Sequence, residues 1–346
     1  MGALLVNFPY MKRCIMLLLV VLSIGSCAQN DIFYDWRREF VSPQSEYFVK
    51  GISVDYGDWG VHDCHTIDII DSIILIKCAA TKSVDKHYIV LDKNRKTYIG
   101  DFINYGNGPN EMIGNRYSGY YGNKLLLFSM GENKVMQWDI NQTLNTGQVV
   151  LTELFDLPLA CFAVIPNNHS NKIIVINHAN QNYNYSIIDS TGNVEKTVPI
   201  YSGINYWTDI TYLSDCYALS QDGDKLVFSM TFLPQVNYIS LSENTKLTVS
   251  TNKRIGWSDI IQKDPGRGLK LYHPRIIPYE DKFVVLSFDE HENTHFHIFD
   301  SIGSFIADVK TSENLRDIAF DSTSRLIYGV DVNSNIYTYD INEFIK

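Results

Sequence analysis

Six short apolar runs, each introduced by a turn and a polar residue, recur along the chain at a regular interval. They begin at residues 72, 124, 172, 225, 282 and 325, as in Lys172-Ile-Ile-Val-Ile and Lys282-Phe-Val-Val-Leu. The spacings between these starts are 52, 48, 53, 57 and 43 residues. Apolar runs of this length between turn formers are typical of buried strands. The pattern therefore predicts a β-rich unit that is repeated six times.

A second strand follows in each unit and ends on a shared polar position. The residue at this position is Asp in five units and Ser in the other: Asp92, Asp139, Asp189, Ser242, Asp300 and Asp340. Such side chains stabilise tight turns because they hydrogen-bond the backbone two residues further on. We therefore expect a tight turn after each of these strands.

A period of about fifty residues with four strand-length runs per unit is the signature of β-propeller blades. We predict an all-β fold, a six-bladed β-propeller that spans residues 45–346. The innermost strands are expected at His65–Ile70, Tyr117–Tyr121, Cys161–Ile165, Cys216–Leu219, Arg275–Pro278 and Asp317–Phe320. Outer strands are expected at Lys96–Phe102, Glu195–Ile200, Lys246–Thr251 and Phe305–Lys310.

The sixth repeat unit lacks an outer strand of its own. The sixth unit has no room for it before Lys346, whereas Glu46–Val54 reads as a strand without a blade. We expect this N-terminal strand to complete the last blade, which closes the ring and covers an edge open to aggregation. Two tandem β-sandwiches are the alternative, but they predict no unpaired strand at each end.

The beginning of the chain has the features of an export signal. Met11-Lys12-Arg13 is basic, Ile15 to Leu22 is apolar, and small residues lead to Cys27. This order is typical of a secretory signal peptide. We expect residues 1–26 to be the signal peptide, Cys27 to be lipidated, and residues 27–44 to be a tether. The alternative is an ordinary signal peptide followed by a chance cysteine.

The net charge excludes some partners. Removing residues 1–26 takes away Lys12 and Arg13 and no acidic residue, so the formal charge changes from -10 to -12. Nucleic-acid binding requires a basic footprint, and binding to anionic lipid does too. We therefore expect no nucleic-acid partner and a membrane contact through the lipid anchor alone.

Four cysteines follow the lipidation position: Cys64, Cys78, Cys161 and Cys216. No Cys-x-x-Cys pair is present, which disfavours a zinc site of that type. Cys64 and Cys78 could face each other across a hairpin, where export would permit a disulfide. Cys161 and Cys216 occupy matching repeat positions and are interpreted as small core residues.

The chain resembles the TolB-like six-bladed propeller lipoproteins of the Bacteroidetes type. The residues that carry the resemblance are Ile24-Gly-Ser-Cys27, which is similar to a lipobox, and Tyr105-Gly-Asn-Gly-Pro-Asn-Glu-Met112. The resemblance implies a propeller in the cell envelope, anchored by lipid at the outer membrane. It implies no activity, because a shared fold does not transfer function.

Two connections on one face of the predicted propeller are the candidate binding loops. Gly106–Glu111 is interpreted as a tight turn, and ligand contact by Asn110, Glu111 and Arg116 is the alternative. Long connections are often functional. The longest one, residues 253–273, supplies aromatic and cationic candidates for ligand binding: Trp257, Arg267, Lys270, Tyr272 and His273. An ordered connector packed on the rim is the competing interpretation.

His291, His295 and His297 form the only histidine cluster of the sequence. No His-Glu-x-x-His or comparable spacing adds further ligands, and His295 occupies the same repeat position as His87 and three Asn residues. A structural role is therefore favoured, and we expect neither a metal nor a cofactor.

No catalytic set of residues is recognisable. The sequence has no Gly-x-Ser-x-Gly motif, and most carboxylates fall in turns. The first hypothesis is a non-enzymatic, membrane-anchored module that binds a protein or glycan partner. The second is a propeller hydrolase or lyase with its site at the channel mouth.

Overall fold

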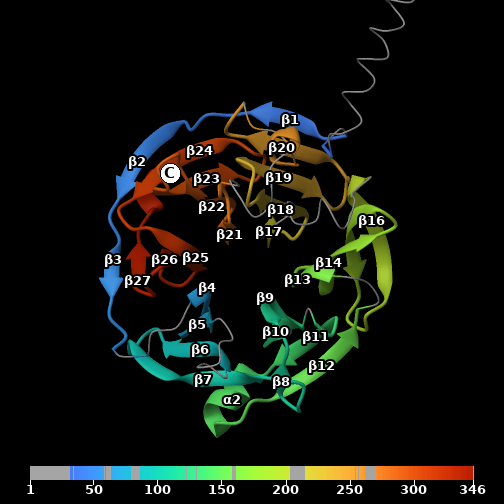
Figure 1. Cartoon of the computed structure of the whole chain (residues 1–346), viewed down its shortest axis with the longest axis vertical. Helices are drawn as coiled ribbons and strands as arrows, with labels where there is room; N and C mark the ends of the chain where they lie inside the picture. Colours follow the sequence, from blue (N-terminus) through green and yellow to red (C-terminus); the bar gives the residue numbers. More distant parts are fainter. Residues whose placement is uncertain are drawn as a thin grey trace, which may run out of the picture.

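The computed structural model is a six-bladed β-propeller whose blades are arranged radially around a central axis (Figure 1). The structure describes residues 32–33, 35–57, 59, 64–78, 86–121, 123–129, 131–157, 161–202, 215–253, 255, 257–261 and 270–345. The expected signal peptide and Cys27 lie outside these residues. No helix within the described part of the chain has the length and apolar character needed to span a bilayer.

The first three blades each contain four consecutive antiparallel strands. Blade 1 comprises β4 (Cys64–Ile70), β5 (Ile73–Cys78), β6 (Lys86–Asp92) and β7 (Thr97–Tyr105), with β8 (Glu111–Met112) parallel to β7. Blade 2 comprises β9 (Asn115–Tyr121), β10 (Lys124–Ser129), β11 (Lys134–Trp138) and β12 (Leu151–Asp156). Blade 3 comprises β13 (Cys161–Asn167), β14 (Lys172–Ala179), β15 (Asn182–Ile188) and β16 (Val194–Ser202).

The last three blades each receive a strand from the beginning of the chain. Blade 4 comprises β17 (Asp215–Leu219), β18 (Lys225–Met230), β19 (Gln235–Ser240), β20 (Lys246–Ser250) and β1 (Arg37–Phe40). Blade 5 comprises β21 (Arg275–Tyr279), β22 (Lys282–Phe288), β23 (Thr294–Asp300), β24 (Phe305–Thr311) and β2 (Ser45–Val49). Blade 6 comprises β25 (Leu315–Asp321), β26 (Leu326–Asp331), β27 (Ile336–Tyr339) and β3 (Ile52–Val54).

The predicted fold is confirmed, including all six inner strands. These strands are β4, β9, β13, β17, β21 and β25, and Figure 1 shows them around the open centre of the ring. The short helices were not predicted. Within the described residues they are α2 (Ile140–Thr146), α4 (Trp257–Ile261) and the 3-10 helix η1 (Asn342–Phe344).

The N-terminal segment closes the ring, as predicted, but it does so with more than one strand. β3 pairs antiparallel with β27, with Ser53 opposite Tyr337. The single strand expected over Glu46–Val54 is divided, because β2 pairs in parallel with β24 of the preceding blade. β1 pairs in parallel with β20 one blade earlier. The outer edges of three neighbouring blades are therefore covered by one continuous segment.

Part of the expected tether is packed on the propeller. Ile32, Phe33 and Trp36 are buried in a core cluster with residues of blades 3 and 4. Burying a large apolar side chain stabilises a fold by about 1.5–3 kcal/mol. The described body of the protein therefore begins at Ile32, before the boundary at residue 45 that the sequence indicated.

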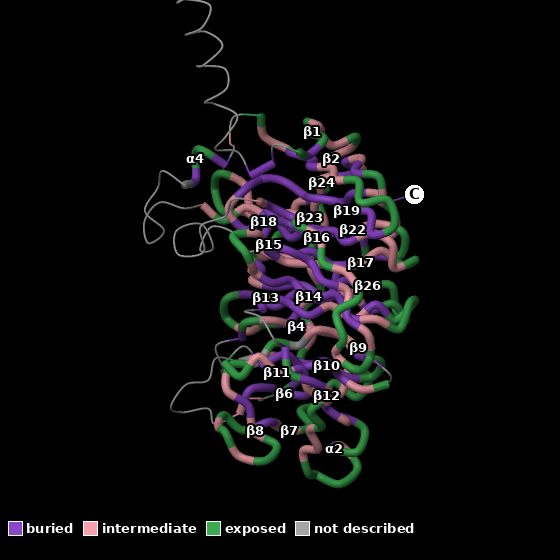
Figure 2. Tube along the Cα trace, turned by 90° about the vertical axis from the view of Figure 1, so that its right-hand side faces the viewer, coloured by how far each residue is buried: buried purple, intermediate pink, exposed green. Residues whose placement is uncertain are grey.

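Apolar side chains fill the interfaces between neighbouring blades. Between blades 4 and 5, for example, Val227 and Val249 lie in one cluster with Phe283 and Val285. Figure 2 shows this burial along the central strands, while the connecting turns are exposed. Each blade thus hides against its neighbours the apolar surface that it cannot bury alone.

The shared Asp position forms the expected turns. One carboxylate oxygen of Asp189 accepts hydrogen bonds from the backbone N–H groups of Thr191 and Asn193, both at 2.9 Å. Asp92 and Asp300 accept two backbone hydrogen bonds each in the same way.

Two of the six positions depart from this arrangement. Asp139 caps the N-terminus of α2 by accepting from the N–H of Gln142 at 2.9 Å. The expected turn after β19 is present, but Ser240 rather than Ser242 stabilises it. Oγ of Ser240 accepts from the N–H of Glu243, whereas the N–H of Ser242 donates to Asp224.

Candidate functional site

The central channel contains a cavity of about 430 Å³ whose wall includes residues from all six inner strands. Cavities of this size accommodate small-molecule ligands. Charged side chains enter the wall from four blades: Asp68 on β4, Arg116 on β9, Asp215 on β17 and Arg275 on β21. The channel is therefore the place where the fold brings polar groups from distant parts of the sequence together.

An ion triad joins blades 5, 6 and 1 at the channel wall. Nη2 of Arg275 lies 2.9 Å from Oδ1 of Asp68, and its Nε lies 3.3 Å from Oδ1 of Asp317. The other oxygen of Asp317 accepts a hydrogen bond from the N–H of Ile67 at 2.8 Å. Three consecutive blades around the ring are thus connected through one guanidinium group.

The triad has two carboxylates for one cation. Burial raises the pKa of Asp68 to about 7, since the neighbouring charge of Asp317 opposes ionisation and Arg275 offsets only part of the effect. Burial also raises the pKa of Asp317. The triad therefore retains a proton up to near-neutral pH.

Asp215 is a further carboxyl group of the channel wall, and it is buried. The hydroxyl of Tyr217 donates to its Oδ2 at 3.0 Å, and the hydroxyl of Tyr183 lies 2.9 Å from that of Tyr217. Oδ1 of Asp215 is buried without a hydrogen-bond partner among the described residues. Burial raises the pKa of Asp215 well above its ordinary value, and the hydrogen bond from Tyr217 offsets part of this effect.

Arg116 is the exposed cation of the channel. It lies on β9 and makes no ion pair within the part of the chain that the structure describes. Its charge adds to burial in lowering the pKa of Lys77 to about 8. Arg116, which the sequence singled out, is therefore free to contact a ligand.

The cysteines near the channel are protected thiols. Sγ of Cys216 donates to the carbonyl oxygen of Pro274 at 2.8 Å, and Sγ of Cys161 donates to that of Ala163 at 3.3 Å. Burial raises the pKa of Cys161 to about 12, which keeps the thiol protonated and unreactive. Cys64 and Cys78 are register partners on β4 and β5, so the disulfide between them remains a prediction.

The turn with Asn110 and Glu111 lies away from the channel. Oε2 of Glu111 accepts from the N–H of Gly108 at 2.9 Å, and Oδ1 of Asn110 accepts from the N–H of Leu151 at 2.9 Å. Figure 1 shows β8, which begins at Glu111, at the periphery of the ring. Glu111 thus stabilises the turn itself, and Asn110 connects the turn to β12 of blade 2.

The long connection before β21 places its candidate residues in different surroundings. Trp257 is buried on α4 within a core cluster, and His273 is fully buried. Nζ of Lys270 lies 5.1 Å from the ring centroid of Tyr272. Arg267 lies outside the described residues. The described part therefore fits an ordered connector, which Figure 2 shows with α4 on the left-hand face.

The sequence did not single out Asp68, Asp215, Arg275 or Asp317. A signal was present, because three of them fall on predicted inner strands, where an ionisable residue interrupts an apolar pattern. Inner strands of a propeller line its channel. Ionisable residues on such strands are therefore the positions to consider first.

The comparisons with known proteins support the fold. A protein of Bacteroides fragilis that is provisionally described as exported matches with a TM-score of 0.53 and 11% identity, over 87% of this chain and 99% of that one. A member of the DUF4221 family from Bacteroides vulgatus matches with a TM-score of 0.52 and 8% identity, over 84% and 95%. Neither a protein-family model nor a curated protein matches the chain. These similarities support the class of fold, a six-bladed propeller.

Proposed function

We propose that this protein is an exported binding module, anchored by lipidated Cys27 at the outer membrane, that takes up a glycan at the mouth of its central channel. The observation that carries the proposal is the channel wall, where the free cation Arg116 and the partly unsatisfied acid Asp215 border one cavity. The export signal of residues 1–26 and the Bacteroides fragilis neighbour support the location. The lipid anchor follows from the lipobox-like residues before Cys27.

A glycan fits this wall better than an extended protein surface. A carboxyl group and a guanidinium group offer the acceptors and donors that sugar hydroxyls need. The rings of Tyr217 and Phe320 line the same cavity and add the apolar surface on which a sugar ring stacks. A protein partner would have to insert a side chain into the channel to reach these groups.

The test is a glycan array with the purified protein, followed by titration of the best ligand. Arg116→Ala should weaken binding about tenfold, because a hydrogen bond to a charged group contributes about 1.5–3 kcal/mol. Glu243→Ala is the matched control, since Glu243 is exposed in a turn between β19 and β20. Equal affinities of the wild type and Arg116→Ala would contradict the channel as the binding site.

A hydrolase or lyase is the alternative function, and one observation favours it. Burial raises the pKa of Asp215, which is the direction of shift that a general acid requires. Incubation of the captured glycan with the protein distinguishes the two functions. An unchanged ligand supports a binding module, whereas product release that Asp215→Asn abolishes would establish an enzyme.

A further inference from the structure

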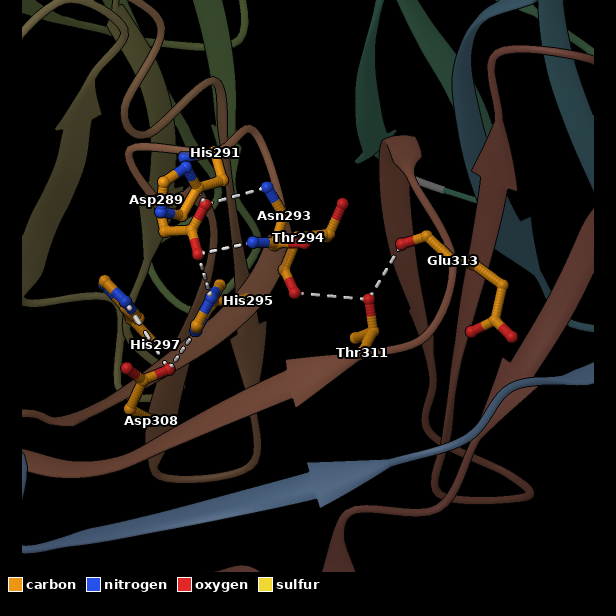
Figure 3. Close-up of polar contacts among 9 residues, drawn as sticks. All are labelled: Asp289, His291, Asn293, Thr294, His295, His297, Asp308, Thr311 and Glu313. Atoms are coloured by element: carbon orange, nitrogen blue, oxygen red, sulfur yellow. Dashed lines mark hydrogen bonds and ion pairs between the residues drawn. The ribbon is translucent and has the colours of Figure 1, made fainter.

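Two histidines and one aspartate converge on the outer half of blade 5 (Figure 3). His295 and His297 are two residues apart on β23, so they project from the same face of the strand. Asp308 is the register partner of His297 on β24. Among the described residues, this is the only set of three metal-binding side chains whose ligand atoms all lie within 4.8 Å of one another.

One carboxylate oxygen faces both rings. Oδ1 of Asp308 lies 2.7 Å from Nδ1 of His295 and 3.7 Å from Nε2 of His297. Zinc binds histidine nitrogen and carboxylate oxygen at about 2.0–2.2 Å in tetrahedral geometry, which places ligand atoms about 3.3 Å apart. The observed separations bracket this value. Small side-chain shifts would therefore bring the three groups around one ion.

A second carboxylate is placed to orient His295. Oδ2 of Asp289 lies 3.5 Å from Nε2 of His295, on the side of the ring opposite Asp308. Asp289 is itself held by the side-chain and backbone N–H groups of Asn293, at 2.7 and 2.9 Å. Metal-bound histidines almost always donate their other N–H to such a group. With the proton on Nε2, the Nδ1 lone pair of His295 points towards Asp308.

Unsatisfied nitrogen atoms surround the cluster. Nδ1 of His297 and Nε2 of His273 are buried without a hydrogen-bond partner among the described residues. The two rings are packed edge to face with their centroids 5.4 Å apart. Nδ1 of His273 lies 3.2 Å from the carbonyl oxygen of Gln235, which can only accept, so Nε2 keeps its lone pair. Buried polar atoms without partners are costly.

Two residues at the same repeat position, His87 and Asn184, are hydrogen-bonded without a metal. Nε2 of His87 lies 2.7 Å from the carbonyl oxygen of Met112, and Asn184 donates to the carbonyl oxygen of Asn182 at 3.1 Å. His295 instead lies between two carboxylates and next to a second imidazole. The structural role that the sequence suggested for this position therefore does not account for the surroundings of His295.

We propose that His295, His297 and Asp308 bind a divalent transition-metal ion of the zinc class, with Asp289 as a positioning residue. Imidazole and carboxylate ligands suit such ions. The three side chains retain 14%, 12% and 23% exposure, so an ion can reach them from solvent. The ion replaces the hydrogen bond between His295 and Asp308 with two bonds to the metal.

The test is calorimetric titration of the chelator-treated, purified protein with Zn²⁺. We expect one ion per chain, and His297→Gln should weaken binding at least about a hundredfold, since loss even of an outer-shell partner costs 10–100-fold. His291→Ala is the matched control, because His291 is exposed in the preceding loop and outside the proposed ligand set. Its affinity should equal that of the wild type.

The positioning role of Asp289 has its own readout. Asp289→Asn should weaken Zn²⁺ about tenfold while the visible absorption of the Co²⁺ form keeps the wild-type shape, because the ligands are unchanged. Thermal unfolding without metal verifies that each variant is folded, and Asp308→Asn replaces His297→Gln if the latter is not. Zn²⁺ binding that is absent in the wild type, or equally tight in the ligand variant, would refute the site.

Discussion

At the scale of single residues, the channel is organised by an imbalance of charge. Arg275 contacts Asp68 and Asp317, so a single cation faces two carboxylates. Asp215 stands apart from this triad and is satisfied on one oxygen only. The triad thus connects blades 5, 6 and 1, whereas Asp215 and Arg116 are the residues to which the proposed function assigns the ligand.

Removing the cation of the triad should be strongly destabilising. Arg275→Ala leaves the buried Asp317 and the partly buried Asp68 without their partner, and breaking a buried ion pair costs about 3–5 kcal/mol. Because Arg275 is 24% exposed, we expect a loss of about 3 kcal/mol in urea unfolding. Arg95→Ala is the control, since Arg95 is largely exposed and should contribute at most about 0.5 kcal/mol. Equal losses in both variants would contradict the role of the triad.

The raised pKa of Asp68 predicts a pH dependence of stability. The folded state holds this proton up to about pH 7, whereas the unfolded chain releases it near its ordinary value. The contribution of protonated Asp68 to the free energy of unfolding is therefore complete below the pKa that Asp68 has in the unfolded chain. It is lost as the pH rises through about 7. Asp68→Asn still accepts the hydrogen bond from Arg275. We expect its free energy of unfolding to change less with pH over this range than that of the wild type, as measured by urea unfolding at a series of pH values.

A second aspartate serves as the control for that measurement. Hydrogen bonds from Thr191 and Asn193 lower the pKa of Asp189 to about 2, so its contribution is lost only as the pH falls towards that value. In Asp189→Asn, the slope of the free energy of unfolding against pH should match that of the wild type between pH 4 and 8. A wild-type slope that persists in Asp68→Asn would refute the assignment.

The sequence could indicate the strands but not which of their residues meet. Asp68 and Asp317 are far apart in the chain and reach Arg275 only because blades 5, 6 and 1 are neighbours around the channel. The repeat pattern defines each blade by itself and carries no information on side-chain directions across the axis. The histidine cluster was visible in the sequence, but its partner Asp308 depends on the register of β23 with β24.

At the scale of elements, the N-terminal segment is the part that the repeat could not describe. The sequence predicted one strand over Glu46–Val54, yet the chain crosses from blade 5 to blade 6 at Gly51. A Cβ atom there would lie 2.7 Å from Oε2 of Glu313 and 2.8 Å from the ring of Tyr339. The glycine permits this close passage, which no periodicity could reveal.

Trp36 should make the segment before β1 a stabilising part of the fold. Its side chain is 6% exposed and is packed edge to face against Phe228, with centroids 6.0 Å apart. Truncation of a buried Trp or Phe costs about 3–5 kcal/mol, so we expect Trp36→Ala to lower the free energy of unfolding by that amount. Phe48→Ala, at a position 60% exposed on β2, should change it by less than about 0.5 kcal/mol. A near-neutral Trp36→Ala would show that the segment is a tether after all.

At the scale of the whole molecule, closure of the ring depends on a few contacts near the crossing point. The N–H of Gly51 donates to Oε2 of Glu313 at 3.1 Å, and the hydroxyl of Tyr339 donates to the same oxygen at 2.8 Å. These bonds hold the segment where it passes from β2 to β3. Blade 6 would otherwise present β27 as an open edge.

Gly51→Val tests this closure. The added side chain collides with Glu313 and Tyr339, and overpacking of this kind costs about 1–3 kcal/mol. We expect the entire unfolding transition to move to lower urea concentration, because the ring loses its closing strand as a unit. Lys50→Val, at the exposed preceding residue, should leave the transition in place. A shift of equal size in both variants would exclude the crossing as the cause.

The way residues 37–54 pair also governs when the protein can fold. These residues leave the ribosome early, and their partners on β20, β24 and β27 are synthesised much later. Such non-local pairing is slow, because the entropy of closing a long loop is lost before the stabilising contacts between the strands form. The ring therefore stays open until β27 emerges, and this delay is compatible with the export that the proposed function requires.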